Sequence, residues 1–222
     1  MKGSIVGGGV YRACEWIAFL AYVNVLWLLF SLLGCILFGF MPATAAMFFC
    51  IRKYRFETKD FPVWATFWQV FRREYRSAQK VGGILGALGG GLFLIHGYVL
   101  PALAGEWAGH LYVYGMEAGI VLCIVLALQY LFPMLAHVEM GMGAYFKNAA
   151  LLFLIRPLHA LGTACGLLLI GSILLRYPSL FPFYGGSIAA MWLSWNYERI
   201  EQSIRSMETM EGTTNHIVKN GG

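Results

Sequence analysis

The residues of this sequence that are best able to do chemistry are polar side chains inside long apolar stretches. An amide, hydroxyl or imidazole surrounded by hydrocarbon must find a hydrogen-bonding partner, either on another helix or on a ligand. We therefore expect these groups to make helix–helix contacts, with a ligand contact as the alternative, and Asn24 is the leading candidate. The candidates for either role are Asn24, Thr44, His96 and Gln129.

Charged side chains are nearly absent from the same stretches. Glu117 lies near one end of a stretch, and no Asp, Lys or Arg falls in the middle of one. A proton pump or coupled transporter keeps ionisable groups at membrane depth despite their cost. His137 and Glu139 could act as an acid/base pair beside Arg156, but a spacing of two residues does not bring them to one helix face. The sequence thus disfavours ion-coupled transport and gives no catalytic residue.

Metal and cofactor sites are not expected. The five cysteines include no C-x-x-C pair, and His96 has no second histidine or carboxylate at metal-ligand spacing. Gly7, Gly8 and Gly9 do not form a phosphate loop, because no strand precedes them and no G-K-[ST] follows. We therefore predict a protein that is not an enzyme and that carries no cofactor.

The composition indicates the elements that must position these groups. Hydrophobic residues make up 59% of the 222 residues and charged residues only 12%, whereas soluble domains carry roughly a quarter charged residues. Crossing a bilayer takes roughly 20 apolar residues. The prediction is one all-α transmembrane helical bundle, residues 1–200, with a polar and partly disordered tail, residues 201–222. Its five or six spans are placed at 16–33, 42–55, 81–103, 111–136, 158–175 and 180–195.

The first two predicted spans form an N-terminal helical hairpin. Gly34, Gly39 and Pro42 interrupt an uncharged run from Trp16 to Ile51 that is too long for one helix. A cleaved signal peptide is the rival interpretation, but such signals have a much shorter apolar core of roughly 7–15 residues.

A basic and aromatic segment follows the hairpin. Its rings recur at helical spacing, and its cations cluster near residue 75. This pattern predicts an amphipathic helix lying in the cytoplasmic membrane interface, with packing on the protein's own inner face as the alternative. The residues concerned are Trp64, Trp68, Phe71, Arg72, Arg73 and Arg76.

The distribution of cations predicts the orientation. With six crossings and an inside N-terminus, 15 of the 16 lysines and arginines lie on one side, and 13 of 16 if the second helix does not cross. The positive-inside rule then places the C-terminus in the cytoplasm. Because the cations lie between apolar spans, nucleic acid is not an expected partner.

Two stripes of small residues indicate close helix packing. The residues are Gly82, Gly86 and Gly90 in one stripe and Gly162 and Gly166 in the other. Such stripes let helices approach closely within a bundle, and they equally serve a homodimer.

Several segments resemble one known family. The stretch Asn24–Phe30 (NVLWLLF) is similar to its first-helix segment LNLLWLLF, and Pro42–Ala46 (PATAA) to its GPATAA turn, although Phe40 and Met41 intrude before the proline. The aromatic and basic stretch 67–75 and the pairs Phe132-Pro133 and Lys147-Asn148 also match. These segments resemble the YesL-like proteins, a bacterial family of unknown function.

The resemblance implies a bacterial cytoplasmic membrane protein whose genes often neighbour sugar-uptake ABC transporters. It supplies no catalytic residue. The leading hypothesis is a non-enzymatic accessory to carbohydrate uptake or sensing, with the lipid bilayer and ABC-type transporter components as partners. The alternatives are a small facilitator for an uncharged solute, lined by Asn24, Gln129 and aromatic rings, and a membrane-embedded enzyme acting on lipid or glycan.

Overall fold

The computed structural model describes residues 3–36, 38–57, 59–95, 114–115, 118–122, 124–126, 129–137 and 141–220, and every regular element in these ranges is helical. Three described segments are long and apolar enough to cross a membrane: Gly9–Leu33, Ala118–Leu135 and Pro157–Arg176. The all-helical fold is therefore as expected, whereas the count of five or six spans stays a prediction.

Helices α1 (Gly3–Leu33) and α2 (Phe40–Phe56) form the expected hairpin, although α1 begins earlier than residue 16. The turn between them depends on two glycines. A Cβ on Gly34 would lie 2.3 Å from the Gly39 Cα, and a Cβ on Gly39 would lie 2.5 Å from the Phe30 carbonyl oxygen. Only hydrogen side chains allow this approach.

Helix α3 (Val63–Leu94) corrects one expectation. The amphipathic segment and the start of the third predicted span form a single continuous helix. This helix runs antiparallel to α2, because the Arg73 guanidinium lies 5.5 Å from the Phe49 ring centroid and Gly82 abuts Met41. The basic segment therefore packs on the protein itself, which was the alternative interpretation. Residues 96–103 of the predicted span lie outside the described residues.

The second half of the chain contains α6 (Leu131–His137), α7 (Met142–Ile155), α8 (Pro157–Arg176), a 3₁₀ turn η2 (Pro178–Leu180), α9 (Phe181–Tyr184) and α10 (Ser187–Asn220). Helix α8 matches the predicted span 158–175. The predicted span 180–195 is wrong as a single helix, because a turn at Gly185 and Gly186 separates α9 from α10.

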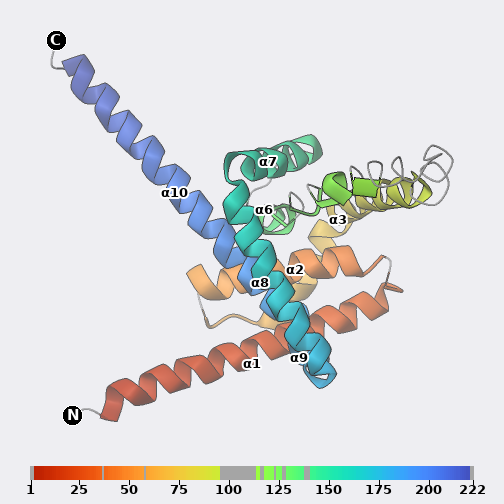
Figure 1. Ribbon diagram of the computed structural model, residues 1–222. Helices are drawn as coiled ribbons and strands as arrows, with labels where there is room; N and C mark the ends of the chain where they lie inside the picture. The colour runs from red at the N-terminus through yellow and green to blue at the C-terminus, as the bar shows by residue number, and fades with distance from the viewer. Residues whose placement is uncertain are drawn as a thin grey trace.

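The C-terminal segment also differs from expectation. Helix α10 continues to Asn220 and projects away from the rest of the molecule in Figure 1, whereas residues 201–222 were expected to be partly disordered. A helix that is already nucleated gains one hydrogen bond for each residue it adds. Its apolar first turns supply the nucleus, so the polar residues beyond them extend an existing helix.

Two hydrophobic cores hold the helices together. The first unites α1, α2 and the first half of α3 with Ala190 of α10. The second unites α6, α7 and α8 with Tyr197 and Ile200 of α10. Helix α10 thus contributes to both cores and crosses the middle of the molecule in Figure 1.

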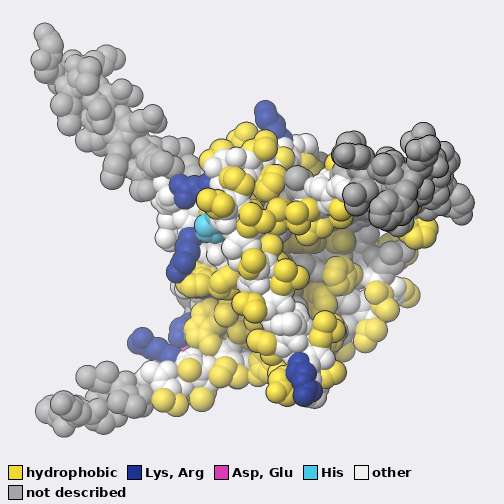
Figure 2. All heavy atoms as spheres, viewed as in Figure 1, with side chains coloured by type: hydrophobic (Ala, Val, Ile, Leu, Met, Phe, Trp, Pro, Cys, Tyr) yellow, Lys and Arg dark blue, Asp and Glu magenta, His cyan; other side chains and the backbone are white. Residues whose placement is uncertain are grey.

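Much of the surface is apolar. Leu158 and Leu175 of α8 are more than four-fifths exposed, and Leu168 and Leu169 of the same helix are about two-thirds or more exposed. Figure 2 shows yellow side chains over most of the visible face and dark-blue cations mainly along its left margin. An exposed apolar surface of this extent is typical of a protein that sits in lipid.

The turn glycines generate a stability prediction. Gly34→Ala should lower the free energy of unfolding by about 1–3 kcal/mol, because the new methyl group collides with the Gly39 backbone and forces the ends of α1 and α2 apart. Gly162→Ala is the matched control, since a Cβ there meets no described atom within 4 Å. Thermal unfolding in detergent, followed by circular dichroism, measures both variants. Equal melting temperatures for Gly34→Ala and the control would contradict the steric interpretation.

Candidate functional site

Asn24 uses every hydrogen-bonding position of its side-chain amide within the protein. Its Nδ2 donates to the carbonyl oxygens of Phe181 (3.2 Å) and Pro182 (2.8 Å), and its Oδ1 accepts from the backbone N–H groups of Gly186 (2.8 Å) and Ser187 (3.0 Å). The side chain is fully buried. An amide has two donors and one oxygen with two lone pairs, so this group is a helix contact with no position left for a ligand.

Thr44 is also consumed by internal contacts. Its hydroxyl donates to the Phe40 carbonyl oxygen (2.7 Å) and accepts from the Trp27 indole N–H (3.0 Å). The bond to Trp27 ties α2 to α1 inside the first core. Thr44 therefore stabilises the hairpin.

In the second half, Gln129 donates its Nε2 to the Ala160 carbonyl oxygen (3.0 Å), which joins the stretch before α6 to α8. Its Oε1 is buried and has no partner among the described residues. Nearby, Trp192 of α10 donates to the Thr163 carbonyl oxygen (3.0 Å) and packs against Gly166, where an added Cβ would lie 2.3 Å from the indole ring.

The glycine stripes are only partly used for packing. Gly82 meets Met41 and Gly166 meets Trp192, whereas a Cβ on Gly86, Gly90 or Gly162 would contact no described atom within 4 Å. The remaining sequence candidates cannot be placed: His96 and Glu139 lie outside the described residues, as does the side chain of His137. Among the described residues, no group of three or more His, Cys, Asp or Glu could hold a metal ion.

Polar contacts join α10 to α2 and to the start of α8. Arg55 forms an ion pair with the buried Glu198 (3.2 Å), and Arg156 donates to the Ser203 hydroxyl (2.8 Å). Burial raises the pKa of the Glu198 carboxyl above its ordinary value, and the Arg55 guanidinium only partly offsets this shift. The Glu198 Oε1 is buried without a hydrogen-bond partner in the described part of the chain.

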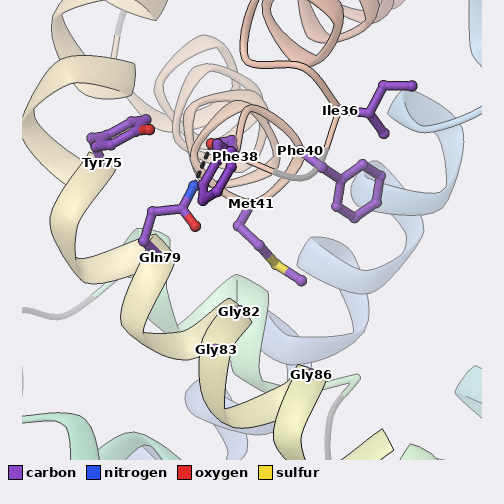
Figure 3. A pocket seen from close by; sticks show the side chains of 9 residues that line it. All are labelled: Ile36, Phe38, Phe40, Met41, Tyr75, Gln79, Gly82, Gly83 and Gly86. Atoms are coloured by element: carbon purple, nitrogen blue, oxygen red, sulfur yellow. Dashed lines mark hydrogen bonds between the residues drawn. The ribbon is translucent and has the colours of Figure 1, made fainter. Parts of the chain in front are cut away.

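A cavity of about 840 Å³ lies between the hairpin turn and α3. We call it the turn cavity. Figure 3 shows its wall: Met41 reaches from α2 toward Gly82, and the Gln79 amide donates to the Phe38 carbonyl oxygen. Its lining is almost wholly apolar: Ile36, Phe38, Phe40, Met41, Tyr75, Gln79, Gly82, Gly83 and Gly86.

A second cavity, of about 500 Å³, adjoins the first through Tyr75 and is lined by Phe71, Arg72, Arg73, Tyr75 and Arg76. Phe71 and these three arginines were predicted from the sequence, while Trp64 and Trp68 lie against Phe30 instead, at centroid distances of 5.5 Å. The turn cavity was not predicted, and its only sequence signal was the intrusion of Phe40 and Met41 before Pro42.

The Asn24 junction generates a second prediction. Asn24→Ala should lower the free energy of unfolding by about 2–4 kcal/mol, because the N–H groups of Gly186 and Ser187 and the Pro182 carbonyl oxygen lose their partner at once. Asn196→Ala is the control, since that amide donates to the Trp192 carbonyl one turn earlier on the same helix. Thermal unfolding in detergent compares them. A loss for Asn24→Ala no larger than for the control would contradict the junction's importance.

The buried Glu198 generates a prediction on pH. A carboxyl whose pKa is higher in the folded state binds more protons there, so its contribution to stability is present below the ordinary value of about 4.3 and is lost as pH rises through the raised value. The wild type should therefore lose stability over this window, and Glu198→Gln should lose less. Melting temperatures measured across the window test this, with Glu57→Gln at the exposed end of α2 as the control. An unchanged slope in Glu198→Gln would exclude Glu198 as the cause.

Several known proteins are similar to this chain in sequence. The family described as "Protein of unknown function, DUF624" matches residues 20–95, which hold the C-terminal part of α1 and all of α2 and α3. In Bacillus subtilis (strain 168), the uncharacterized protein YesV is 35% identical over 81% of this chain and 85% of its own length. The uncharacterized protein YesL is 30% identical over 85% of this chain and 88% of its own length. No solved structure matches the chain. The chain therefore belongs to the YesL-like family, whose function is unknown.

Proposed function

We propose that this chain is a non-enzymatic protein of the bacterial cytoplasmic membrane that acts as an accessory to a carbohydrate uptake or sensing system. The proposal has two parts with different support. The accessory role is supported by the internal contacts of the buried polar groups. The link to carbohydrates is supported only by the gene neighbourhoods that the family resemblance implies.

The observation that carries the accessory role is the use of the intramembrane polar residues. Asn24 spends all four hydrogen-bonding positions on α9 and α10, and Thr44 spends its hydroxyl inside the hairpin. A solute path or a catalytic pocket needs polar groups that are free to meet a substrate. Groups that are fully committed to helix contacts build a scaffold instead.

The same observation disfavours the facilitator. An uncharged solute would need amide and hydroxyl groups along its path, and Asn24 and Gln129 were the candidates. Asn24 is saturated by the backbone, and the Gln129 amide nitrogen is bound to Ala160, which leaves only the Gln129 Oε1 without a partner among the described atoms of these two amides. The larger cavity is apolar and lies at the hairpin turn, away from both amides.

The orientation belongs to the proposal as well. We place the ion pair of Arg55 with Glu198, and the C-terminal end of α10, on the cytoplasmic side. Support comes from the bias of lysine and arginine toward one side of the predicted spans. The Arg156–Ser203 contact lies on that same side in this arrangement.

Co-purification and uptake test the proposed function together. A C-terminally tagged chain, extracted in mild detergent, should recover subunits of a sugar transporter, and deletion of the gene should lower uptake of that sugar. The control is another tagged multi-pass protein of equal abundance. The tag should also be inaccessible from outside intact cells. Recovery of no transporter subunit, combined with unchanged uptake of a sugar panel, would refute the proposal, and flux of a sugar into proteoliposomes holding this chain alone would establish the facilitator.

A further inference from the structure

We propose that the turn cavity and the adjoining second cavity, which is lined by Arg72, Arg73 and Arg76, form one binding site for a single anionic phospholipid. The phosphate is held by Arg72 and Arg76, and one acyl chain lies in the turn cavity between the hairpin and α3. This inference is independent of the proposed role in carbohydrate uptake.

The apolar part of the site fits a hydrocarbon chain. Its volume of about 840 Å³ falls in the range of roughly 300–1,000 Å³ that is typical of small-molecule sites. Ile36 and Phe38 of the turn are more than half exposed, so apolar surface faces the open space. The one amide of the lining, Gln79, already donates to the Phe38 carbonyl oxygen. The cavity wall can therefore contact a hydrocarbon chain without leaving the Gln79 amide N–H that bonds Phe38 unpaired.

The charged part of the site fits a phosphate. Arg73 pairs with Glu74 at 2.8 Å, whereas neither Arg72 nor Arg76 forms an ion pair with a described residue. The linings of the two cavities contain no carboxylate. The Arg72 guanidinium lies 5.7 Å from the Trp68 ring centroid, which limits its freedom. Guanidinium groups bind phosphate through paired N–H donors, so an anionic headgroup complements this end.

The two parts lie on one line along α3. Arg72, Arg76, Gln79, Gly83 and Gly86 follow one another at intervals of four, three, four and three residues, which keeps them on one helix face. From Arg76 to Gly86 the helix rises about 15 Å at 1.5 Å per residue. One leaflet of a bilayer is also about 15 Å deep, half of a hydrocarbon core of about 30 Å. A lipid whose phosphate meets Arg76 can therefore lay its chain along the glycines to the depth of the leaflet.

The glycines keep the chain's path open. A Cβ on Gly83 or Gly86 would meet no described atom within 4 Å, so a larger side chain at either position extends into the turn cavity without displacing a described neighbour. This property permits a variant that fills the site and spares the fold.

Lipid titration of the purified full chain in detergent, read by native mass spectrometry, tests the proposal. The probes are phosphatidylglycerol and phosphatidylcholine with the same chains. We expect one phosphatidylglycerol per chain, bound more tightly than phosphatidylcholine. Arg72→Gln with Arg76→Gln should weaken phosphatidylglycerol binding by roughly fivefold for each charge removed, and should weaken phosphatidylcholine binding less, because the choline ammonium offsets the charge of its phosphate. Gly83→Leu with Gly86→Leu should weaken binding of both lipids at least tenfold.

Matched controls separate the site from the general surface. Lys147→Gln removes an exposed cation of α7, and Gly162→Leu adds the same side chain to an open position of α8. Both should leave lipid binding unchanged, and circular dichroism should show the wild-type helix content in every variant. Equal binding of the two lipids, or equal losses in the controls, would overturn the proposal. Full displacement of the lipid by glycerol phosphate would overturn the role given to the acyl chain. A dimer that contains no lipid would assign the turn cavity to a second copy of the chain.

Discussion

The arrangement of the helices depends on the saturated amide of Asn24. One side chain on α1 holds two carbonyl oxygens at α9 and two N–H groups at the start of α10, more than 150 residues away in the sequence. These backbone groups lie at the interruption between α9 and α10, where helix ends leave backbone N–H and C=O groups without partners inside a helix. In hydrocarbon such groups have no water to turn to, so the break between α9 and α10 can exist only where the amide meets it.

The position of α3 beside the hairpin constrains how the first core sits in a bilayer. Gln79 and Gly82 lie at the hairpin turn, so Arg76 and Lys80 lie near the end of the hairpin, whereas Arg73 lies beside Phe49 farther along α2. Charges are costly inside hydrocarbon. A hairpin that crosses completely would carry these cations to the far leaflet unless they face a polar space. A hairpin whose turn lies at the level of lipid headgroups leaves them beside phosphates, which neutralise them.

Local features of this fold could be predicted from the sequence, and relations between distant segments could not. Gly34, Gly39 and Pro42 predicted the hairpin because turn chemistry is local, and the apolar run after Pro157 predicted α8 because hydropathy is local. The amphipathic helix was predicted, but its packing on α2 depends on contacts between side chains such as Arg73 and Phe49. Asn24 could be recognised as needing a partner, although nothing near it in the sequence indicates that the partners are at residues 181–187. The turn cavity leaves only the intrusion of Phe40 and Met41 as a trace in the sequence, because its volume results from the packing of the turn against two helices.

The sharing of α10 between both cores has a mechanical consequence. Ala190 is fixed in the first core and Ile200 in the second, Trp192 fills the space left by Gly166, and Glu198 is paired with Arg55. Neither sliding nor turning of this helix can occur without disturbing all four points together. Helix α10 thus couples the two halves of the molecule rigidly. A binding partner that displaces its polar C-terminal end would shift both halves together.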